Sequence, residues 1–128
     1  WGGIGCHSQH AFHQLLMQGT QRVAIDFIYI AQADDIAHQE MQHHLNHQLF
    51  AQSKALLQGN QAKQPCQHRL IRGNVPHCLI RLEQLTPRAL GMLFALYEYR
   101  TFLTACLWRI NPFDQFGVEL GKELALES

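Results

Sequence analysis

The fold class is decided by one stretch, Val23-Ala24-Ile25-Asp26-Phe27-Ile28-Tyr29-Ile30. The run is almost continuously apolar and rich in β-branched and aromatic residues, which is typical of a parallel-sheet strand covered on both faces. A second such run, Cys78-Leu79-Ile80-Arg81-Leu82, follows Pro76. Helical periodicity flanks both runs, so the sequence predicts an α/β fold with a parallel sheet. Because two strands do not make a stable sheet alone, we expect further strands from sequence upstream.

The segment before the first strand predicts a helix from Gln9 to Gln18, with apolar residues at helical spacing. Ser8 is suited to cap this helix and Gly19 to end it. His10 would then lie in the first turn, off the apolar stripe. Two interpretations follow: a merely exposed imidazole, or a proton acceptor, because the positive end of a helix favours the neutral ring.

A long helix is expected after the loop at residues 32–35. Its apolar stripe consists of Ile36, Met41, Leu45, Leu49, Phe50, Leu56 and Leu57, and Gly59-Asn60 close it. Its polar face carries His38, His43, His44 and His47. Pairs one turn apart have chelating geometry, but no H-E-x-x-H motif and no third ligand accompany them. We therefore predict a solvated face and no metal site, followed by a linker over residues 60–72 with Pro65 in its middle.

The segment from Arg88 to Arg109 is strongly apolar and predicts a long buried helix. Thr86 is a suitable cap, and Pro87 suits the first helical position. The length approaches that of a membrane span, but Glu98 and Arg100 at its centre would be costly in hydrocarbon. We therefore expect a helix of a soluble core.

A last helix is expected to begin at Asn111, whose side-chain oxygen can accept a free N–H of the first turn. Pro112 suits the first helical position because its fixed φ is already helical. Asp114 adds negative charge near the positive end of the helix dipole.

This last helix also carries a pattern typical of a binding site. Gln115 and Lys122 lie two turns apart, so an amide and an ammonium would point the same way. Gly117 and Gly121 each cost about 1 kcal/mol of helix stability relative to Ala. Such a cost indicates that another group approaches the helix backbone closely.

Composition restricts the class of protein. The 128 residues are 47% hydrophobic and 16% charged, which is enough to bury one core. Ten basic and ten acidic residues balance, so we expect neither nucleic acid nor membrane as a partner. No segment has the features of a signal peptide, and Cys6, Cys66, Cys78 and Cys106 lack metal or disulfide spacing, which predicts free thiols in the cytoplasm. The chain starts within a glycine-rich segment, and we interpret it as a piece of a longer protein.

Two segments near opposite ends resemble glucose-6-phosphate isomerases. Residues 113–122 resemble the family signature aromatic-Asp-Gln-x-Gly-Val-Glu-x-x-Lys, and residues 1–20 resemble W-G-x-x-G-T-N-x-Q-H-A-F-x-Q-L-x-x-Q-G-T. Cys6-His7 replace the usual Thr-Asn, which affects local loop contacts and not His10. Residues 73–76 are similar to G-N-x-P and residues 85–98 to L-T-P-x-x-L-G-x-L-x-A-x-Y-E, whereas residues 31–72 match poorly.

The resemblance implies an αβα layered sugar-isomerase (SIS-type) fold, present here as its helix-rich C-terminal portion. Residues 1–85 would end the second sugar-isomerase subdomain, and residues 86–128 would form the C-terminal helices. The implied activity is the reversible isomerisation of glucose 6-phosphate to fructose 6-phosphate in glycolysis and gluconeogenesis. The implied enzyme is a cytoplasmic homodimer that uses no metal or organic cofactor.

The resemblance also assigns roles to three residues. His10 and Lys122 would be the catalytic groups that open the sugar ring, and Gln115 would contact the sugar phosphate substrate. In the family the histidine comes from the neighbouring subunit. The family's glutamate base, which moves a proton through an enediolate, its arginine and its Ser/Thr phosphate loop precede the matched part. This chain would therefore carry the ring-opening residues only, and we expect it to be inactive alone.

Two other classes of function remain open from the sequence. A non-catalytic dimerisation or sugar-phosphate-binding module of the same fold would be favoured by the loss of His10 or Lys122, and both are present. A histidine-rich metal-binding protein would require tight, stoichiometric metal.

Overall fold

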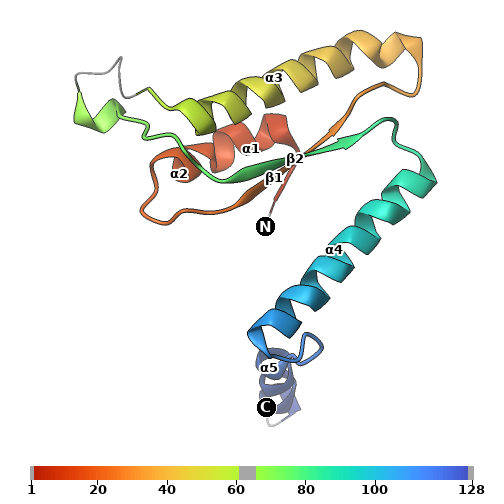
Figure 1. Cartoon of the computed structure of the whole chain (residues 1–128). Coiled ribbons are helices and arrows are strands. Elements are labelled where there is room, and N and C mark those ends of the chain that lie inside the picture. Colours follow the sequence, from red (N-terminus) through yellow and green to blue (C-terminus); the bar gives the residue numbers. More distant parts are fainter. Residues whose placement is uncertain (1, 61–65, 127–128) are drawn as a thin grey trace. The chain divides into compact units, whose positions relative to one another are not determined.

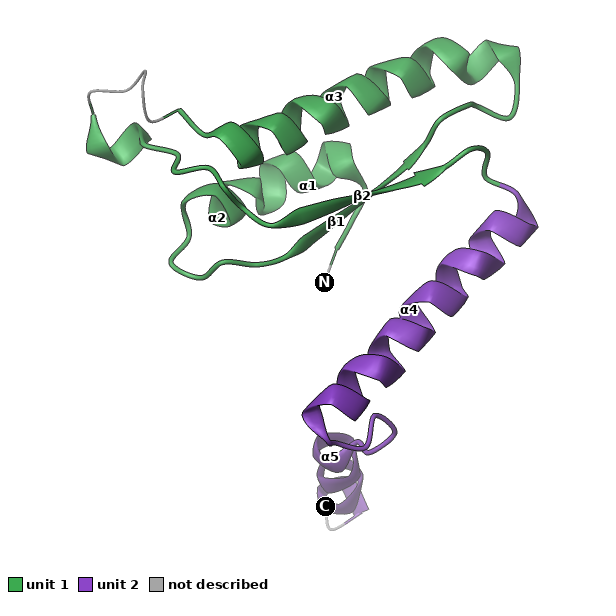
Figure 2. Ribbon diagram, in the orientation of Figure 1, with its two compact units in different colours: residues 1–85 green, residues 86–128 purple. Residues whose placement is uncertain are grey.

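The computed structural model describes residues 2–60 and 66–126, so Trp1 and the centre of the expected linker, with Pro65, lie outside the described residues. The chain divides into two compact units, Trp1–Leu85 and Thr86–Ser128 (Figures 1 and 2). Unit 1 contains α1 (Gly5–Ala11), α2 (His13–Gln18), β1 (Ile25–Ile30), the 3-10 helix η1 (Ile36–His38), α3 (Gln39–Gln58), the 3-10 helix η3 (Gln67–Arg69) and β2 (His77–Leu82). Unit 2 contains α4 (Pro87–Trp108) and α5 (Phe116–Leu126).

The sheet of unit 1 consists of β1 and β2, which run parallel in a register from Ile25 opposite His77 to Ile30 opposite Leu82. Both strands lie where the sequence predicts them, and the α/β class with a parallel sheet is confirmed. The strand β1 begins at Ile25, whose N–H donates to the Pro76 carbonyl over 3.1 Å. Residues 23 and 24 of the predicted run precede the strand.

The helices α1, α2 and α3 lie on one face of this sheet (Figure 1). Ile25 and Phe27 pack on that face against a core of Leu16, Leu56 and Val75. Successive strand residues point to opposite faces, so Ile28 belongs to the other face, where 42% of it remains exposed. Within the described part of unit 1, helices therefore cover one face of the sheet, where the sequence predicted cover on both.

Two glycines let the end of α3 meet the entry to β2. Gly59 (φ 62°) closes α3 as predicted, and Gly73 (φ 73°) lies beside it. A Cβ added to Gly59 would lie 2.2 Å from the Ile71 carbonyl oxygen, so only glycine fits. The N–H of Asn74 donates to Leu57 O over 2.8 Å, which starts the chain toward β2.

The long helix α3 is covered over only part of its apolar stripe. Leu56 is fully buried, whereas Ile36 is 95%, Met41 56% and Leu57 58% exposed. The predicted stripe is present in the sequence, but two strands and two short helices offer too little surface to cover it. Asp35 caps the preceding turn η1 by accepting the His38 N–H over 2.9 Å.

In unit 2, α4 begins as predicted, because Thr86 Oγ1 accepts the Ala89 N–H over 3.1 Å and Pro87 follows the cap. It ends at Arg109 in the left-handed conformation (φ 58°). The prediction that α4 is buried is wrong for this unit, because Trp108 is 70% exposed and α5 is the unit's only other described helix. Among the described helices, none combines the length and the apolar character that a membrane crossing needs.

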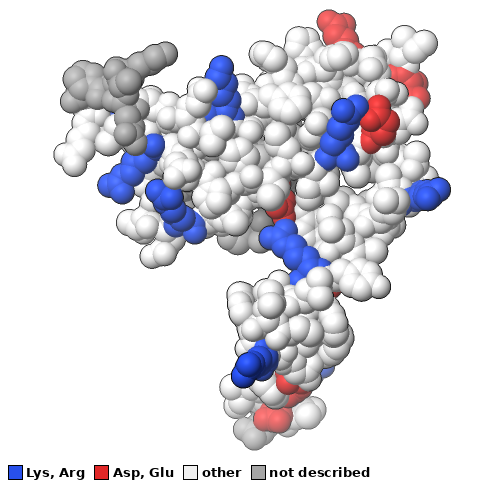
Figure 3. Space-filling model, in the orientation of Figure 1, with Lys and Arg blue, Asp and Glu red and all other residues white. Residues whose placement is uncertain are grey.

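The distribution of charged side chains on the surface agrees with the equal numbers of basic and acidic residues in the sequence. Basic and acidic side chains are scattered among uncharged atoms on the face shown in Figure 3, and one basic group lies directly beside an acidic one. The four cysteines are free and exposed, as predicted.

Candidate active site

His10 lies in the last turn of α1 and is exposed. The prediction that it lies in the first turn is wrong, because the helix begins at Gly5, where a loop was expected. The N–H groups of His7 and Ser8 both donate to the Ile4 carbonyl, over 3.0 and 2.9 Å, and so close the first turn earlier. The argument from the positive end of the helix dipole therefore does not apply to His10.

Ser8 does not cap a helix. Its side chain is buried (5% exposed), and its hydroxyl donates to the Ile4 carbonyl over 2.9 Å within α1. Two residues rotate by about 200° around a helix, so His10 projects on nearly the opposite side from Ser8. The buried position of Ser8 thus turns the His10 imidazole outward, where its ring makes no hydrogen bond to the described residues.

The single helix predicted over Gln9–Gln18 is broken at Phe12, whose φ of −145° and ψ of 1° lie outside the helical range. The new helix α2 begins at His13, which is buried (7% exposed). His13 was not among the candidate residues. The signal that identifies it is its spacing of three residues from the buried Leu16, which places both on one helix face.

The start of α5 differs from the prediction. Asn111 does not cap the helix; its Oδ1 accepts the Phe113 N–H over 3.1 Å and its Nδ2 donates to Asp114 Oδ1 over 2.8 Å. These bonds satisfy the asparagine within a local turn, and α5 begins only at Phe116. Gln115 therefore immediately precedes the helix, and its carbonyl accepts two N–H groups of the first turn of α5, from Val118 over 2.9 Å and from Glu119 over 3.0 Å.

Lys122 lies in the middle of α5 and is exposed, as is Gln115. In the described part of the chain Lys122 makes no salt bridge, so its ammonium is available to a ligand. The two residues flank the first turns of one helix, although Gln115 lies outside it. A Cβ added to Gly117 or Gly121 meets nothing within 4 Å, so the close approach that these glycines indicated is not made by the described residues.

The three candidate residues are divided between the units: His10 belongs to unit 1, and Gln115 and Lys122 belong to unit 2. Gln115 directly precedes α5 and Lys122 lies within it, whereas His10 lies on α1. His10 on α1 and Lys122 on α5 are both exposed, and the side chain of each ends in a basic nitrogen. Such groups can exchange protons with a bound ligand.

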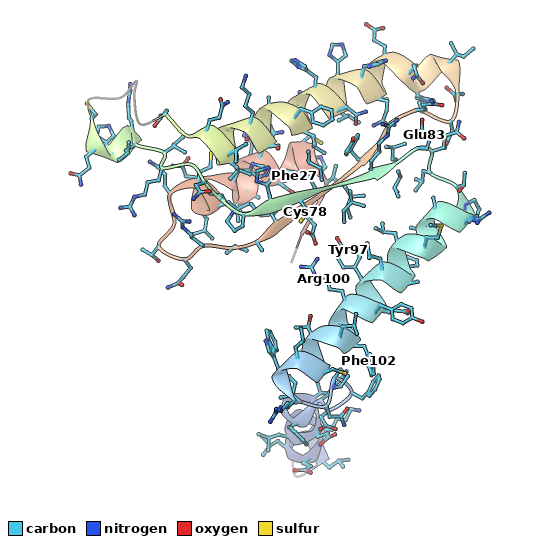
Figure 4. All side chains as sticks on the ribbon, viewed as in Figure 1. Phe27, Cys78, Glu83, Tyr97, Arg100 and Phe102 are labelled. Atoms are coloured by element: carbon cyan, nitrogen blue, oxygen red, sulfur yellow. The ribbon has the colours of Figure 1, made fainter. Side chains whose placement is uncertain are left out.

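The described residues form a hollow in each unit, and neither of these two hollows is lined by a candidate residue. In unit 2 a hollow of about 300 Å³ is lined by Tyr97, Arg100, Thr101, Thr104, Ala105, Trp108, Ile110 and Pro112. The Arg100 guanidinium lies 5.7 Å from the centre of the Tyr97 ring, and both residues are labelled in Figure 4. In unit 1 a second hollow is lined by Met17, Gln18, Gly19, Thr20, Gln67, His68, Leu70 and Arg72.

The described histidines of η1 and α3 do not gather into a metal site. His44 Nε2 lies 3.9 Å from Glu40 Oε1, and His38 Nδ1 lies 2.9 Å from Asp35 Oδ1. Among the described residues there is no group of three or more His, Cys, Asp or Glu side chains that could hold a metal ion. The metal-binding interpretation gains no support from this arrangement.

Comparison with known proteins gives one consistent result. The family model for phosphoglucose isomerase matches residues 1–127. The chain is 46% identical to glucose-6-phosphate isomerase 2 of Chromohalobacter salexigens, a match that covers 100% of this chain and 25% of that protein. It is also 46% identical to glucose-6-phosphate isomerase of Xylella fastidiosa, covering 99% of this chain and 25% of that protein.

A solved structure agrees. The crystal structure of a glucose-6-phosphate isomerase from Chlamydia trachomatis matches with a TM-score of 0.83 and 36% identity, over 99% of this chain and 25% of that one. The chain therefore spans about a quarter of the length of the relatives that it matches. Because the family model covers nearly every residue, this chain belongs to the phosphoglucose isomerase family.

Proposed function

We propose that this chain forms the C-terminal quarter of a glucose-6-phosphate isomerase and contributes ring-opening residues to it. The observation that carries the proposal is the family match over residues 1–127, at 46% identity to relatives four times as long. The reaction is the interconversion of glucose 6-phosphate and fructose 6-phosphate, with sugar phosphate as the substrate.

His10 and Lys122 are the catalytic residues of this proposal, and Gln115 binds the substrate. An exposed imidazole and an exposed ammonium can take up and deliver the protons that ring opening requires. Gln115 adds an amide directly before α5, two turns ahead of Lys122, where a phosphorylated ligand would also meet the N–H groups of Phe116 and Gly117 at the start of the helix.

The complete enzyme of this proposal is a cytoplasmic homodimer with a layered αβα sugar-isomerase fold. The half-exposed face of the sheet around Ile28 is where a further layer would pack. Residues 1–85 would end the second sugar-isomerase subdomain, and residues 86–128 would supply the C-terminal helices. In a twofold dimer, His10 of one subunit would enter the site that contains Lys122 of the other.

Subunit exchange tests this proposal. Complete enzymes carrying His10→Ala or Lys122→Ala are each expected to lose activity on cyclic glucose 6-phosphate. In a mixed dimer one site has both lesions and the other has neither, so mixing the two inactive proteins should restore activity. The His10→Ala protein taken alone through the same exchange procedure is the control, and it should stay inactive.

Three outcomes contradict the proposal in different ways. If the unmutated complete enzyme does not isomerise glucose 6-phosphate, the chain belongs to a non-catalytic binding or dimerisation module of this fold. If it is active and either variant keeps full activity, that residue has been misassigned. If native mass spectrometry shows mixed dimers and activity stays at background, the site is not shared between subunits.

A further inference from the structure

We infer that the buried pair His13–Gln52 is a positioning device that sets the orientation of His10, an inference that rests on the proposed ring-opening role of His10. His13 begins α2 immediately after the break at Phe12, three residues beyond His10. Its imidazole is 7% exposed, and its Nδ1 lies 3.3 Å from Oε1 of Gln52 on α3. An amide oxygen only accepts, so Nδ1 carries the proton and donates it to Gln52.

The acceptor Gln52 is itself held in place through its neighbour. Ser53 is buried (9% exposed), and its hydroxyl lies 2.8 Å from Nε2 of His77 at the start of β2. The other nitrogen of that ring, Nδ1, lies 2.8 Å from the Val75 carbonyl oxygen and must donate to it. This tautomer leaves Nε2 to accept the Ser53 hydroxyl proton, and the bond ties α3 to β2 at the helical turn that contains Gln52.

The Phe27 ring packs against both histidines; we call the group of His13, Gln52, Ser53, His77 and Phe27 the frame. The Phe27 ring, on the face of the sheet that carries the helices (Figure 4), lies 5.8 Å from the His77 ring and 6.3 Å from the His13 ring, edge to face in both cases. Among the described residues, no buried side-chain nitrogen or oxygen lacks a hydrogen-bond partner. A fully satisfied buried network of this kind favours one arrangement of its elements over others.

The frame determines where His10 points. Ser8 is buried on one side of α1, and His13 fixes the chain just after the last turn of the same helix. Between these two anchors α1 has little freedom to rotate, so the imidazole of His10 is held outward in one direction. In the family pattern of residues 1–20 the position of His13 is unspecified, so the pair is a feature of this chain and not of the pattern.

The experiment compares variants of the complete enzyme on cyclic glucose 6-phosphate and on an open-chain aldose phosphate, which bypasses ring opening. His13→Phe keeps a ring in the core and removes the donor. We expect it to lower turnover of the cyclic substrate by about 10-fold to 100-fold, the size expected of a catalytic group misplaced by about 1 Å. Turnover of the open-chain substrate should stay unchanged. His13→Asn should restore activity, because its Nδ2 can occupy the place of the histidine Nδ1.

Three further variants make the test specific. In a His10→Ala background, His13→Phe should cause no additional loss, because it acts only through His10. His44→Asn, at an exposed histidine of α3 with 76% side-chain exposure, is the matched control and should change neither activity. If His13→Phe fails to fold, Gln52→Met keeps the histidine, removes its acceptor and should show the same selective loss.

An equal loss on both substrates, or a loss of the same size in the His10→Ala background, would show that the pair only stabilises the fold and would overturn the inference. An unchanged cyclic turnover in a folded His13→Phe enzyme would also overturn it. If the unmutated enzyme isomerises neither substrate, the proposed function fails, and this inference fails with it.

Discussion

At the residue scale, Lys122 and Asp35 show how one side chain can be tested without disturbing the rest. Lys122 is exposed in the middle of α5, so its removal leaves the packing of unit 2 unchanged. Asp35 is an exposed cap whose two partners both belong to His38. A change in turnover after removal of Lys122, or a change in pH dependence after replacement of Asp35, can therefore be assigned to that side chain.

Lys122→Ala in the complete enzyme should lower turnover of cyclic glucose 6-phosphate by about 10²- to 10⁴-fold, the usual contribution of a positioned acid or base. Open-chain sugar phosphate should be affected much less, because it does not need the ring to open. Coupled assays with both substrates measure the difference. Lys54→Ala, at an exposed lysine of α3, is the control for loss of one positive charge. Equal losses on both substrates would mean that Lys122 mainly holds the phosphate charge.

Asp35 should titrate below an ordinary aspartate. The His38 backbone N–H, followed by the His38 ring, bonds to the ionised carboxylate and lowers the pKa of Asp35. A lowered folded-state pKa stabilises η1 above the unfolded pKa of about 3.9, and this stabilisation is lost as the pH falls through the folded value. Carboxyl-carbon NMR titration should report the lowered pKa, and Asp35→Asn should remove the pH dependence while keeping a cap. A pKa at or above the ordinary value would contradict this assignment.

At the scale of elements, α3 is attached to unit 1 through a short part of its length. Leu56 is fully buried against Leu16 and Val75, while its neighbour Leu57 is 58% exposed. Packing at this one turn, with the Ser53–His77 bond beside it, therefore determines how firmly α3 holds to the sheet.

Leu56→Ala should lower the free energy of unfolding by about 2–5 kcal/mol, because it removes buried methyl groups and leaves a cavity. Leu57→Ala is the matched control on the next residue and should cost less than about 0.5 kcal/mol. Urea unfolding followed by circular dichroism measures both. If the two substitutions have the same cost, α3 does not pack through Leu56 in the complete protein.

At the scale of the whole molecule, the chain exposes large apolar side chains in both units. Ile36 (95%), Leu107 (82%) and Trp108 (70%) are examples, and soluble monomers seldom expose so much apolar surface together. The chain spans a quarter of the length of the relatives that it matches. In the complete enzyme proposed above, we expect the rest of the protein to cover these groups.

We expect the isolated 128-residue chain to have no isomerase activity. As the family resemblance implies, the proton-transfer base and the phosphate loop would precede the part of the enzyme that this chain represents. A coupled assay on protein whose intact mass corresponds to residues 1–128, with the complete enzyme as the positive control, tests this. Measurable turnover by the isolated chain would show that residues 1–128 contain a full catalytic set.

The sequence by itself determined the features that depend on local patterns. The two strands, the capped start of α4 at Thr86-Pro87 and the end of α3 at Gly59 follow from β-branched runs, a capping side chain and a glycine, each of which acts on its immediate neighbours. Short motifs with many fixed positions also indicated the family before the fold was known. The candidate residues His10, Gln115 and Lys122 come from these motifs, and their roles remain predictions.

The tertiary structure alone decided the features that depend on distant partners. Whether an apolar stripe is buried depends on what else is present to cover it, and for α3 and α4 the described units offer little. The role inferred for His13 depends on Gln52, which lies 39 positions along the chain and meets it in the core. The starts of α1 and α5 moved because Ser8 and Asn111 bond to neighbouring backbone groups instead of capping a helix. These bonds are local, but a polar side chain has several local partners of similar energy, and the capping pattern alone does not tell which one it takes.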